Sequence, residues 1–464
     1  MLISASGLRR LFIVLLGICV IAATSASLAS AHPRKHPRSQ THMSKRAKAA
    51  RARQRAVQRA KGRKPPVRTI KPTKAPAPPK TVPAPAPTPT PTPTVPAPTA
   101  PTPTPTPTPT VTVTTPTATV TAPTTTTPTP TLPVTPPTTI ANSFGAGMFG
   151  IAAGGMLQGD DAATLTRDLN MDAASGARWI RVDINWAQIQ AAGPNSYDWS
   201  GVDAVVEGAH ARGMNVLGGI LYSPSWEAAT PTTAPNPSDY ATFAAAAARH
   251  YAPLGVQAFE IWNEPNTSSS WTNPSPAAYT RVLKAAYPAI KAVDPSGIVV
   301  TAGLSPSPTD GTNYSPVDFL SGIYANGGQG SFDAVGAHPY CAPDYPGDTD
   351  SWSAWYQMYG TPTSMRSVMI AHGDGAKKIW ATEFGAPTGG PVGSGFVSTA
   401  VQAAMVARAY QVWSTYNWGG PLFLYQGRDE GTDNTTREYH YGFINNNFTP
   451  KPAYAAYQAL TAVL

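Results

Sequence analysis

The sequence from Ala141 to Leu464 predicts an α/β fold, namely a closed (β/α)8 barrel in which each parallel strand is followed by a helix. Three observations support this prediction. Short apolar runs alternate with amphipathic stretches, a pattern typical of parallel strands joined by helical crossovers. The alternation occurs eight times. The segment is 324 residues long, which suits a barrel of this kind with some long loops.

The expected strands are the apolar runs, and the expected helices lie between them. The strands are predicted near residues 147–152, 178–184, 214–220, 256–262, 298–302, 332–337, 378–382 and 421–425. The helices are predicted near 161–175, 201–212, 238–251, 276–293, 317–325, 363–372, 398–416 and 453–464. The helix at 276–293 has a clear start in the sequence, because Ser275 suits a helix N-cap and Pro276 suits the first helical position.

An open, doubly wound sheet is the alternative architecture. If it bound a nucleotide, such a sheet would carry a Gly-rich phosphate turn after its first strand and an acidic residue further on. Here Ala152-Ala-Gly-Gly155 follows the first apolar run, and no suitable acidic residue comes later. The closed barrel is therefore favoured.

Residues 1–31 are expected to be a secretory signal peptide. Arg9-Arg10 form its charged start, Leu11–Ala23 its apolar run, and Ala29-Ser30-Ala31 a cleavage site of small residues. An uncleaved N-terminal anchor is the alternative, although the apolar run is shorter than the ~20 residues that a membrane span needs. In both cases the protein is expected to be secreted or associated with the cell surface.

A basic, proline-rich arm is expected between the signal and the barrel. Residues 32–80 hold 17 Lys and Arg and no acidic residue, and residues 81–140 are a Pro/Thr-rich linker. Because such sequence has little apolar surface to bury, we expect the basic segment to be disordered and the linker to be extended. The arm suits contact with an anionic cell-wall polymer or membrane surface, or it serves as a tether without a specific partner.

The barrel segment has the opposite charge. From residue 141 on, 15 Lys and Arg stand against 25 Asp and Glu, a net charge of −10 within a chain of net charge +9. An acidic folded segment argues against nucleic acid as a partner. Cys341 is the sole cysteine beyond the signal, so no internal disulfide is expected, and a packed thiol is favoured over a nucleophile. No group of residues has the spacing of zinc ligands, so neither a metal nor another cofactor is expected.

Two glutamates each close an apolar run. Glu264 lies in Val256-Gln-Ala-Phe-Glu-Ile-Trp-Asn-Glu-Pro-Asn266, and Glu383 lies in Lys378-Ile-Trp-Ala-Thr-Glu-Phe-Gly385. The C-terminal ends of the strands are where a (β/α)8 barrel places its chemistry. A pair of carboxylates facing one bond is the minimal machinery for cutting a glycoside.

These motifs resemble those of glycoside hydrolase clan A, most of all its family-39 and family-5 branches. Trp262-Asn-Glu-Pro265 resembles the strand-four motif of the clan, and Thr382-Glu-Phe-Gly385 resembles its strand-seven motif. The strand count above independently places the two glutamates after the fourth and seventh strands. The resemblance implies a retaining enzyme with Glu264 as acid/base and Glu383 as nucleophile. We expect Glu264 to be kept protonated by an apolar wall and nearby negative charge.

The same resemblance implies a set of supporting polar residues. Arg181 and Tyr340 would donate hydrogen bonds to Glu383, and Asn263 would bind the 2-hydroxyl group of the sugar. His338 would bind the substrate or orient a carboxylate. A structural histidine at the barrel rim is the alternative.

Aromatic side chains near the strand ends are candidates for packing against sugar rings. They are Trp186, Tyr222, Trp226, Trp271 and Tyr425, each of which can alternatively fill the top of the barrel. Many clan members end strand eight with a tryptophan. Here Tyr425 or Gln426 takes that place, so the identity of the sugar stays open.

The sequence therefore predicts a secreted, retaining O-glycoside hydrolase that cleaves a β-linked oligo- or polysaccharide. A non-catalytic carbohydrate- or cell-wall-binding protein on the same scaffold is one alternative. The intact set of polar residues argues against it, because a degenerate site normally loses at least one of them. A transglycosylase is the other alternative, and the sequence does not distinguish it from a hydrolase.

Overall fold

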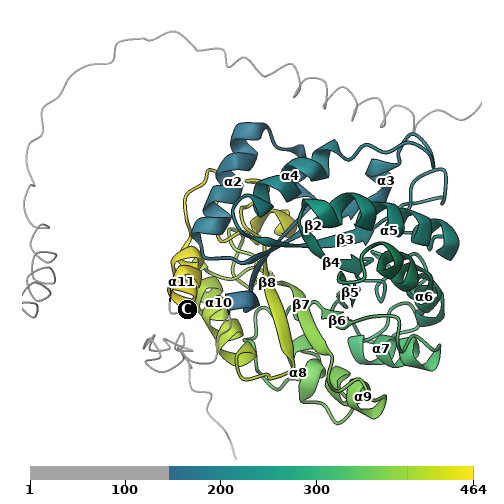
Figure 1. Ribbon diagram of the computed structural model, residues 1–464. Helices are drawn as coiled ribbons and strands as arrows, with labels where there is room; N and C mark the ends of the chain where they lie inside the picture. Colours follow the sequence, from purple (N-terminus) through teal and green to yellow (C-terminus); the bar gives the residue numbers. More distant parts are fainter. Residues whose placement is uncertain (1–145, 394, 463–464) are drawn as a thin grey trace, which may run out of the picture. The chain divides into compact units, whose positions relative to one another are not determined.

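The computed structural model describes residues 146–393 and 395–462, which form a closed barrel of eight parallel strands (Figure 1). The strands pair in chain order, and β8 closes the barrel against β1. This arrangement confirms the predicted fold class. The expected signal peptide, basic segment and Pro/Thr linker lie outside the described residues, as do the last two residues of the expected C-terminal helix. Within the described ranges, no helix is both long and apolar enough to cross a bilayer.

Every expected strand is present, with bounds within two residues of those predicted. The strands are β1 (Phe149–Gly154), β2 (Trp179–Asn185), β3 (Asn215–Leu221), β4 (Val256–Ile261), β5 (Ile298–Thr301), β6 (Ala334–Ala337), β7 (Lys378–Phe384) and β8 (Gly419–Tyr425). Each alternates between an interior position and a position facing the helices, as a strand with a two-residue repeat must.

The expected helices also form, and they surround the strands. They are α2 (Ala162–Ala174), α4 (Ser200–His210), α5 (Pro237–Tyr251), α6 (Pro276–Val293), α7 (Pro316–Ala325), α9 (Met365–Ala371), α10 (Thr399–Trp413) and α11 (Pro452–Thr461). Side-chain oxygens cap several of them, including that of Ser275 before α6. The sequence interpretation missed the short helices α3 (Trp186–Ile189) and α8 (Ala354–Tyr359), which have too few turns to show a helical repeat.

One apolar layer crosses the barrel interior. It contains one residue from each strand: Ala152, Trp179, Leu217, Ala258, Val300, Ala334, Trp380 and Phe423. Its largest rings meet edge to face, with the centroids of Trp179 and Trp380 5.2 Å apart. The apolar layer fills the barrel interior below the C-terminal ends of the strands.

Two residues further along three of these strands the interior becomes polar. Arg181 follows Trp179 on β2, Glu260 follows Ala258 on β4, and Thr382 follows Trp380 on β7. All three side chains are buried. We call these three residues, with their hydrogen-bond partners, the charged layer; it lies between the apolar layer and the cavity described below.

Candidate active site

A cavity of about 720 Å³ opens at the C-terminal ends of the strands. Seven residues predicted from the sequence to form the site line it: Arg181, Tyr222, Asn263, Glu264, Tyr340, Glu383 and Tyr425. They come from the ends of β2, β3, β4, β7 and β8 and from the segment after β6. The closed barrel is what brings these distant residues together.

A strained turn after β4 presents two of these residues. Trp262 and Glu264 adopt left-handed backbone conformations, with φ of 74° and 45°. Such conformations cost a non-glycine residue about 1–3 kcal/mol. The turn is held because the Trp262 N–H donates to the carbonyl of Ile220 at 2.9 Å and the Glu264 N–H donates to that of Gly303 at 3.2 Å. Asn263 and Glu264 both line the cavity as a result.

The Glu383 carboxylate is oriented by two donors. Arg181 Nη1 donates to Oε1 at 2.8 Å, and the Tyr340 hydroxyl donates to Oε2 at 2.8 Å. Burial, assisted by the negative charge of Glu383, raises the pKa of Tyr340 far above its usual value. The phenol therefore keeps its proton and remains a donor across the physiological pH range.

Arg181 joins both glutamate motifs. Its side chain is 1% exposed, and its Nη2 donates to Asn263 Oδ1 at 2.9 Å while its Nε donates to Glu260 Oε2 at 2.6 Å. Burial lowers the pKa of Arg181, but the charges of Glu260 and Glu383 outweigh it and raise that pKa. The arginine stays charged, and because it occupies the amide oxygen of Asn263, the Asn263 NH₂ group is the part available to a ligand.

Glu260 was not identified from the sequence. Its Oε1 accepts hydrogen bonds from the Gly303 N–H and the Thr382 hydroxyl, both at 2.8 Å, and the residue is wholly buried. The signal was available: an acidic residue stands inside the apolar run of β4, four positions before Glu264. A carboxylate in such a place needs buried partners, which indicates a network inside the barrel.

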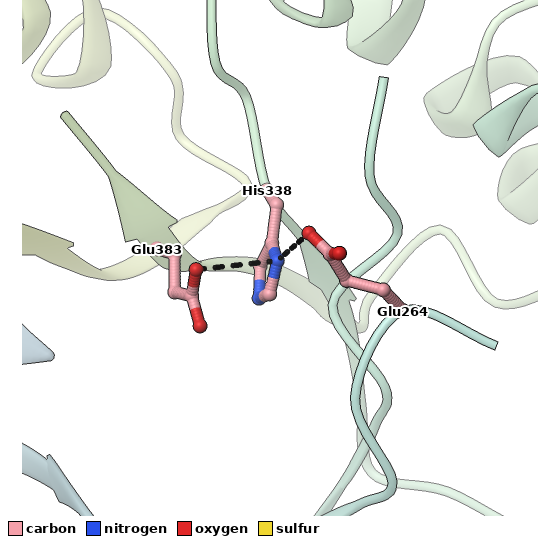
Figure 2. Close-up of side chains that lie close together, drawn as sticks. All are labelled: Glu264, His338 and Glu383. Carbon is pink, nitrogen blue, oxygen red and sulfur yellow. Dashed lines mark hydrogen bonds and ion pairs between the residues drawn. The ribbon is translucent and has the colours of Figure 1, made fainter. Parts of the chain in front are cut away.

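His338 lies between the two catalytic candidates (Figure 2). Its Nδ1 is 2.9 Å from Glu264 Oε1 and 3.6 Å from Glu383 Oε2, and its ring is wholly buried. Burial lowers the pKa of His338, but the charge of Glu383 and the hydrogen bond with Glu264 outweigh it and raise that pKa. Burial raises the pKa of Glu264, but the hydrogen bond and charge of His338 outweigh it and lower that pKa.

These shifts correct the sequence-based expectation for Glu264. An apolar wall and nearby negative charge were expected to keep a proton on its carboxyl group, whereas His338 favours the ionised carboxylate. The two shifts therefore favour a proton on the imidazole over one on the Glu264 carboxyl group. Because the pair carries one proton in either arrangement, moving that proton to Glu264 leaves the net charge of the site unchanged.

The spacing of the two carboxylates bears on mechanism. One oxygen of Glu264, one oxygen of Glu383 and a ring nitrogen of His338 all lie within 4.8 Å of one another. Retaining glycosidases place their carboxyl groups ~5–5.5 Å apart, and inverting ones ~6.5–9.5 Å apart. Three such atoms are also close enough to share a cation. The absence of a metal therefore remains a prediction, which activity measured in excess chelator would check.

Two of the five expected aromatic residues line the cavity, namely Tyr222 and Tyr425. The structure adds two aromatic rings that the sequence interpretation did not select. Tyr441 lies against Tyr425, with centroids 5.4 Å apart, and Trp352 is 49% exposed on the segment after β6. No strand end marks either residue in the sequence, because both come from long loops.

Five expected site residues lie away from the cavity lining. This corrects the prediction for four of them, and the fifth, His338, is the wholly buried histidine that contacts both glutamates. Trp186 and Trp271 are wholly buried, so neither offers a ring face to a sugar. Trp226 is half-buried, and its indole N–H donates to the carbonyl of Gln190 at 2.8 Å. Gln426 is also wholly buried, so the end of β8 presents Tyr425 instead. The three tryptophans thus follow the alternative interpretation, in which they pack at the top of the barrel.

Four charged residues at the cavity were also missed. Asp183 stands two positions after Arg181 on β2, and the two-residue repeat of a strand could have identified it as interior. Glu430, Arg437 and Glu438 come from the loop after β8, where no periodic pattern marks them. Cys341 is a free, buried thiol, in agreement with the structural role expected for it.

Comparisons with known proteins identify the family of the chain. The sequence matches the cellulase family, glycosyl hydrolase family 5, over residues 141–420. None of the curated proteins compared matches the sequence.

Solved structures with a similar fold include three glycoside hydrolases. A family 39 glycoside hydrolase from the gut symbiont Bacteroides cellulosilyticus shares 22% identity with a TM-score of 0.55, covering 70% of this chain and 65% of that one. A family 5 subfamily 18 protein from Bifidobacterium longum subsp. longum, in complex with Manβ1-4GlcNAc, shares 13% identity with a TM-score of 0.52, covering 68% and 78%. A family 39 β-xylosidase from Caulobacter crescentus shares 20% identity with a TM-score of 0.50, covering 68% and 70%.

At these identities the structural likeness establishes the barrel fold alone. The sequence match extends further, because it spans more than half of the chain and includes both glutamate motifs. The chain therefore belongs to the cellulase family, glycosyl hydrolase family 5. It spans slightly less than two thirds of the length of the family 39 structure from Bacteroides cellulosilyticus.

Proposed function

We propose that the protein is a secreted, retaining O-glycoside hydrolase that cleaves a β-linked oligo- or polysaccharide by double displacement. The observation that carries the proposal is the pair of carboxylates of Glu264 and Glu383, which approach within 4.8 Å inside one cavity. They come from β4 and β7 and are joined by one histidine. This spacing leaves room for one anomeric carbon between them and favours retention.

In the first step, Glu383 attacks the anomeric carbon. A bond forms between its carboxylate oxygen and that carbon, the glycosidic carbon–oxygen bond breaks, and the leaving oxygen takes a proton from Glu264. Arg181 and Tyr340 hold the attacking carboxylate through their two hydrogen bonds. The free NH₂ group of Asn263 donates to the 2-hydroxyl, where a hydrogen bond strengthens as positive charge develops on the ring.

The proton delivered by Glu264 comes from the pair that it forms with His338. In the free protein the imidazole Nδ1 lies 2.9 Å from Glu264 Oε1, within hydrogen-bonding distance for the transfer of that proton. Transfer to the carboxyl group yields a neutral imidazole and a general acid beside the leaving group. In the second step, Glu264 removes a proton from water, the water oxygen bonds to the anomeric carbon, and the bond from that carbon to Glu383 breaks, which restores the starting state.

NMR spectroscopy of the anomeric protons during early turnover tests this proposal. A β-glycoside substrate should yield the β-anomer first, followed by slow mutarotation. Initial formation of the α-anomer would contradict double displacement. The same reaction run with an acceptor sugar distinguishes a hydrolase from a transglycosylase, because only the latter forms a new glycoside in preference to the free sugar.

Export and surface association form part of the proposal and rest on residues 1–140. The apolar run in residues 1–31 supports export, and the basic segment of residues 32–80 supports contact with anionic polymer or membrane. Removing residues 32–139 should abolish retention on cell walls at low salt while leaving turnover of small aryl glycosides intact. Retention that persists after the deletion would argue against this role.

A further inference from the structure

Asp183 is a carboxylate of the site to which none of the described residues donates a hydrogen bond. It lines the cavity beside Arg181, whose Nη1 is 3.8 Å from its Oδ1, too far for a hydrogen bond. Nε, Nη1 and Nη2 of Arg181 donate instead to Glu260, Glu383 and Asn263. Within the described part of the chain, the Asp183 side chain accepts no hydrogen bond, although its side chain is only 20% exposed.

Such a carboxylate is open to a ligand. Its side chain is 20% exposed in the cavity lining, so hydroxyl groups of a bound ligand can reach it and replace solvent donors. The pKa of Asp183 is raised to about 6, because burial and the charges of Glu383, Glu260 and Glu430 together outweigh the lowering effect of Arg181. The hydroxyl groups of Tyr222 and Tyr425 also lie within electrostatic reach. The surrounding groups therefore act on the Asp183 carboxylate through their charges, and none of the described ones donates a hydrogen bond to it.

Two glycines, Gly154 and Gly155, lie next to Asp183 in the cavity lining. A Cβ atom added at Gly155 would lie 3.5 Å from Asp183 Oδ2, and one added at Gly154 would lie 3.7 Å from it. Gly154 has a φ of +55°, a left-handed conformation that favours glycine. A side chain at either position would make van der Waals contact with the Asp183 carboxylate, and the two glycines present only backbone to it.

The position of Asp183 relative to the two glutamates indicates which sugar it meets. The leaving group must lie beside Glu264, which protonates it, at the end of β4. The sugar attacked by Glu383 therefore extends over the remaining wall, which β1 and β2 supply. That wall contains Asp183 and the two glycines.

The charge of the cavity restricts the class of that sugar. Among the described residues that line the cavity, five are acidic and two are arginines. Arg181 is already paired with Glu383, and Arg437 lies 3.4 Å from Glu438. A carboxylate on the attacked sugar would meet Asp183, Glu383 and Glu430 without a free cation, whereas neutral hydroxyl groups would supply the donors that Asp183 lacks.

We propose that Asp183 is a specificity-determining residue, whose carboxylate accepts hydrogen bonds from hydroxyl groups of the attacked sugar and selects a neutral sugar over a uronic acid. This inference rests on the proposed glycosidase function and names the substrate class of the same site.

The test measures each enzyme variant with each substrate, using the full-length protein and aryl β-glycosides. For the neutral glycoside that is turned over fastest, Asp183→Asn and Asp183→Ala should lower kcat/KM about 10- to 100-fold, the effect of losing hydrogen bonds to a charged acceptor. Monodeoxy versions of that glycoside identify the hydroxyl group. The deoxy position that contacts Asp183 should cost the wild type a similar factor and cost Asp183→Ala no more than about 3-fold.

A matched control and a charge comparison complete the experiment. Asp239→Asn changes an exposed aspartate in the first turn of α5, outside the cavity lining, and should leave every rate unchanged. The uronic acid counterpart of the chosen glycoside should react more slowly than the neutral one with the wild type, and Asp183→Asn should narrow that ratio. Melting temperatures measured in parallel separate these effects from a loss of folding.

The outcomes are distinguishable. Equal losses for all deoxy substrates in wild type and Asp183→Ala, or a uronate preferred by the wild type, would overturn the role of Asp183 and leave the glycosidase intact. Failure of the wild type to hydrolyse any glycoside would instead overturn the proposed function together with this inference.

Discussion

The apolar layer and the charged layer of the barrel interior lie two residues apart on the same strands, yet they have opposite character. In the apolar layer, Trp179 and Trp380 pack edge to face. In the charged layer, the next interior residues on these strands are Arg181 and Thr382, both bound to Glu260. One two-residue step along a strand separates a hydrophobic floor from an ionic network.

The two layers have different roles in the barrel. The apolar layer excludes water and lowers the local dielectric constant, which strengthens each interaction above it. Burying charges is unfavourable unless they are paired, and the charged layer meets that condition because both oxygens of Glu260 have donors. We therefore expect substitutions in the apolar layer to lower stability and those at the cavity to lower activity.

The largest expected effect on activity is at Glu383. Glu383→Ala removes the nucleophile, so turnover should fall by about 10⁴-fold or more on every substrate, with folding preserved. Added azide should restore turnover from the vacated side and yield a glycosyl azide of inverted configuration, which NMR identifies. Near-normal activity without azide would exclude Glu383 as the nucleophile.

A smaller and substrate-dependent loss is expected at Glu264. Glu264→Ala should slow substrates with poor leaving groups about 10²–10⁴-fold, because general acid assistance is lost. Dinitrophenyl glycosides need little protonation, so their glycosyl-enzyme should still form and accumulate. Azide should accelerate its breakdown and give a product of retained configuration. If the two alanine variants showed the opposite azide stereochemistry, the assigned roles would be reversed.

A pair of substitutions compares the two layers directly. Glu260→Gln should reduce kcat by about 10-fold or more, because the positioning of Arg181 against Glu383 weakens. Trp380→Ala, one layer below, should cost about 3–5 kcal/mol in the free energy of unfolding while leaving kcat within a few-fold of wild type at permissive temperature. Denaturant titration and kinetics on both proteins check this contrast. An intact kcat in Glu260→Gln would remove the functional distinction between the layers.

The smallest expected effect is a shift in the pH dependence of kcat/KM, which depends on His338. The raised pKa of His338 keeps one proton on its pair with Glu264 above the usual histidine pKa, so the basic limb of kcat/KM should lie above it. His338→Gln leaves Glu264 to hold the proton alone, so that limb should move to lower pH. A pH–rate profile of both proteins measures the shift. An unchanged basic limb would show that the proton comes from elsewhere.

The sequence predicted the barrel closely for a physical reason. The apolar repeat of a strand and the caps of a helix depend on neighbouring residues, so each strand bound agreed within two residues. Glu264 and Glu383 were found because their motifs end strands, and parallel strands of a barrel end on one face. These features are local patterns combined with one rule of topology.

The tertiary structure alone decided how the residues of the site affect one another. His338 and Glu264 are separated by 74 positions, so the lowered pKa of Glu264 depends on a contact that no local pattern encodes. The burial of Trp186 and Trp271, which removes them from the cavity, likewise results from tertiary packing, of Trp186 against Phe243 on α5 and of Trp271 against Trp262 and Tyr279. Electrostatic interaction and burial depend on distance in space, and only the closed barrel sets those distances.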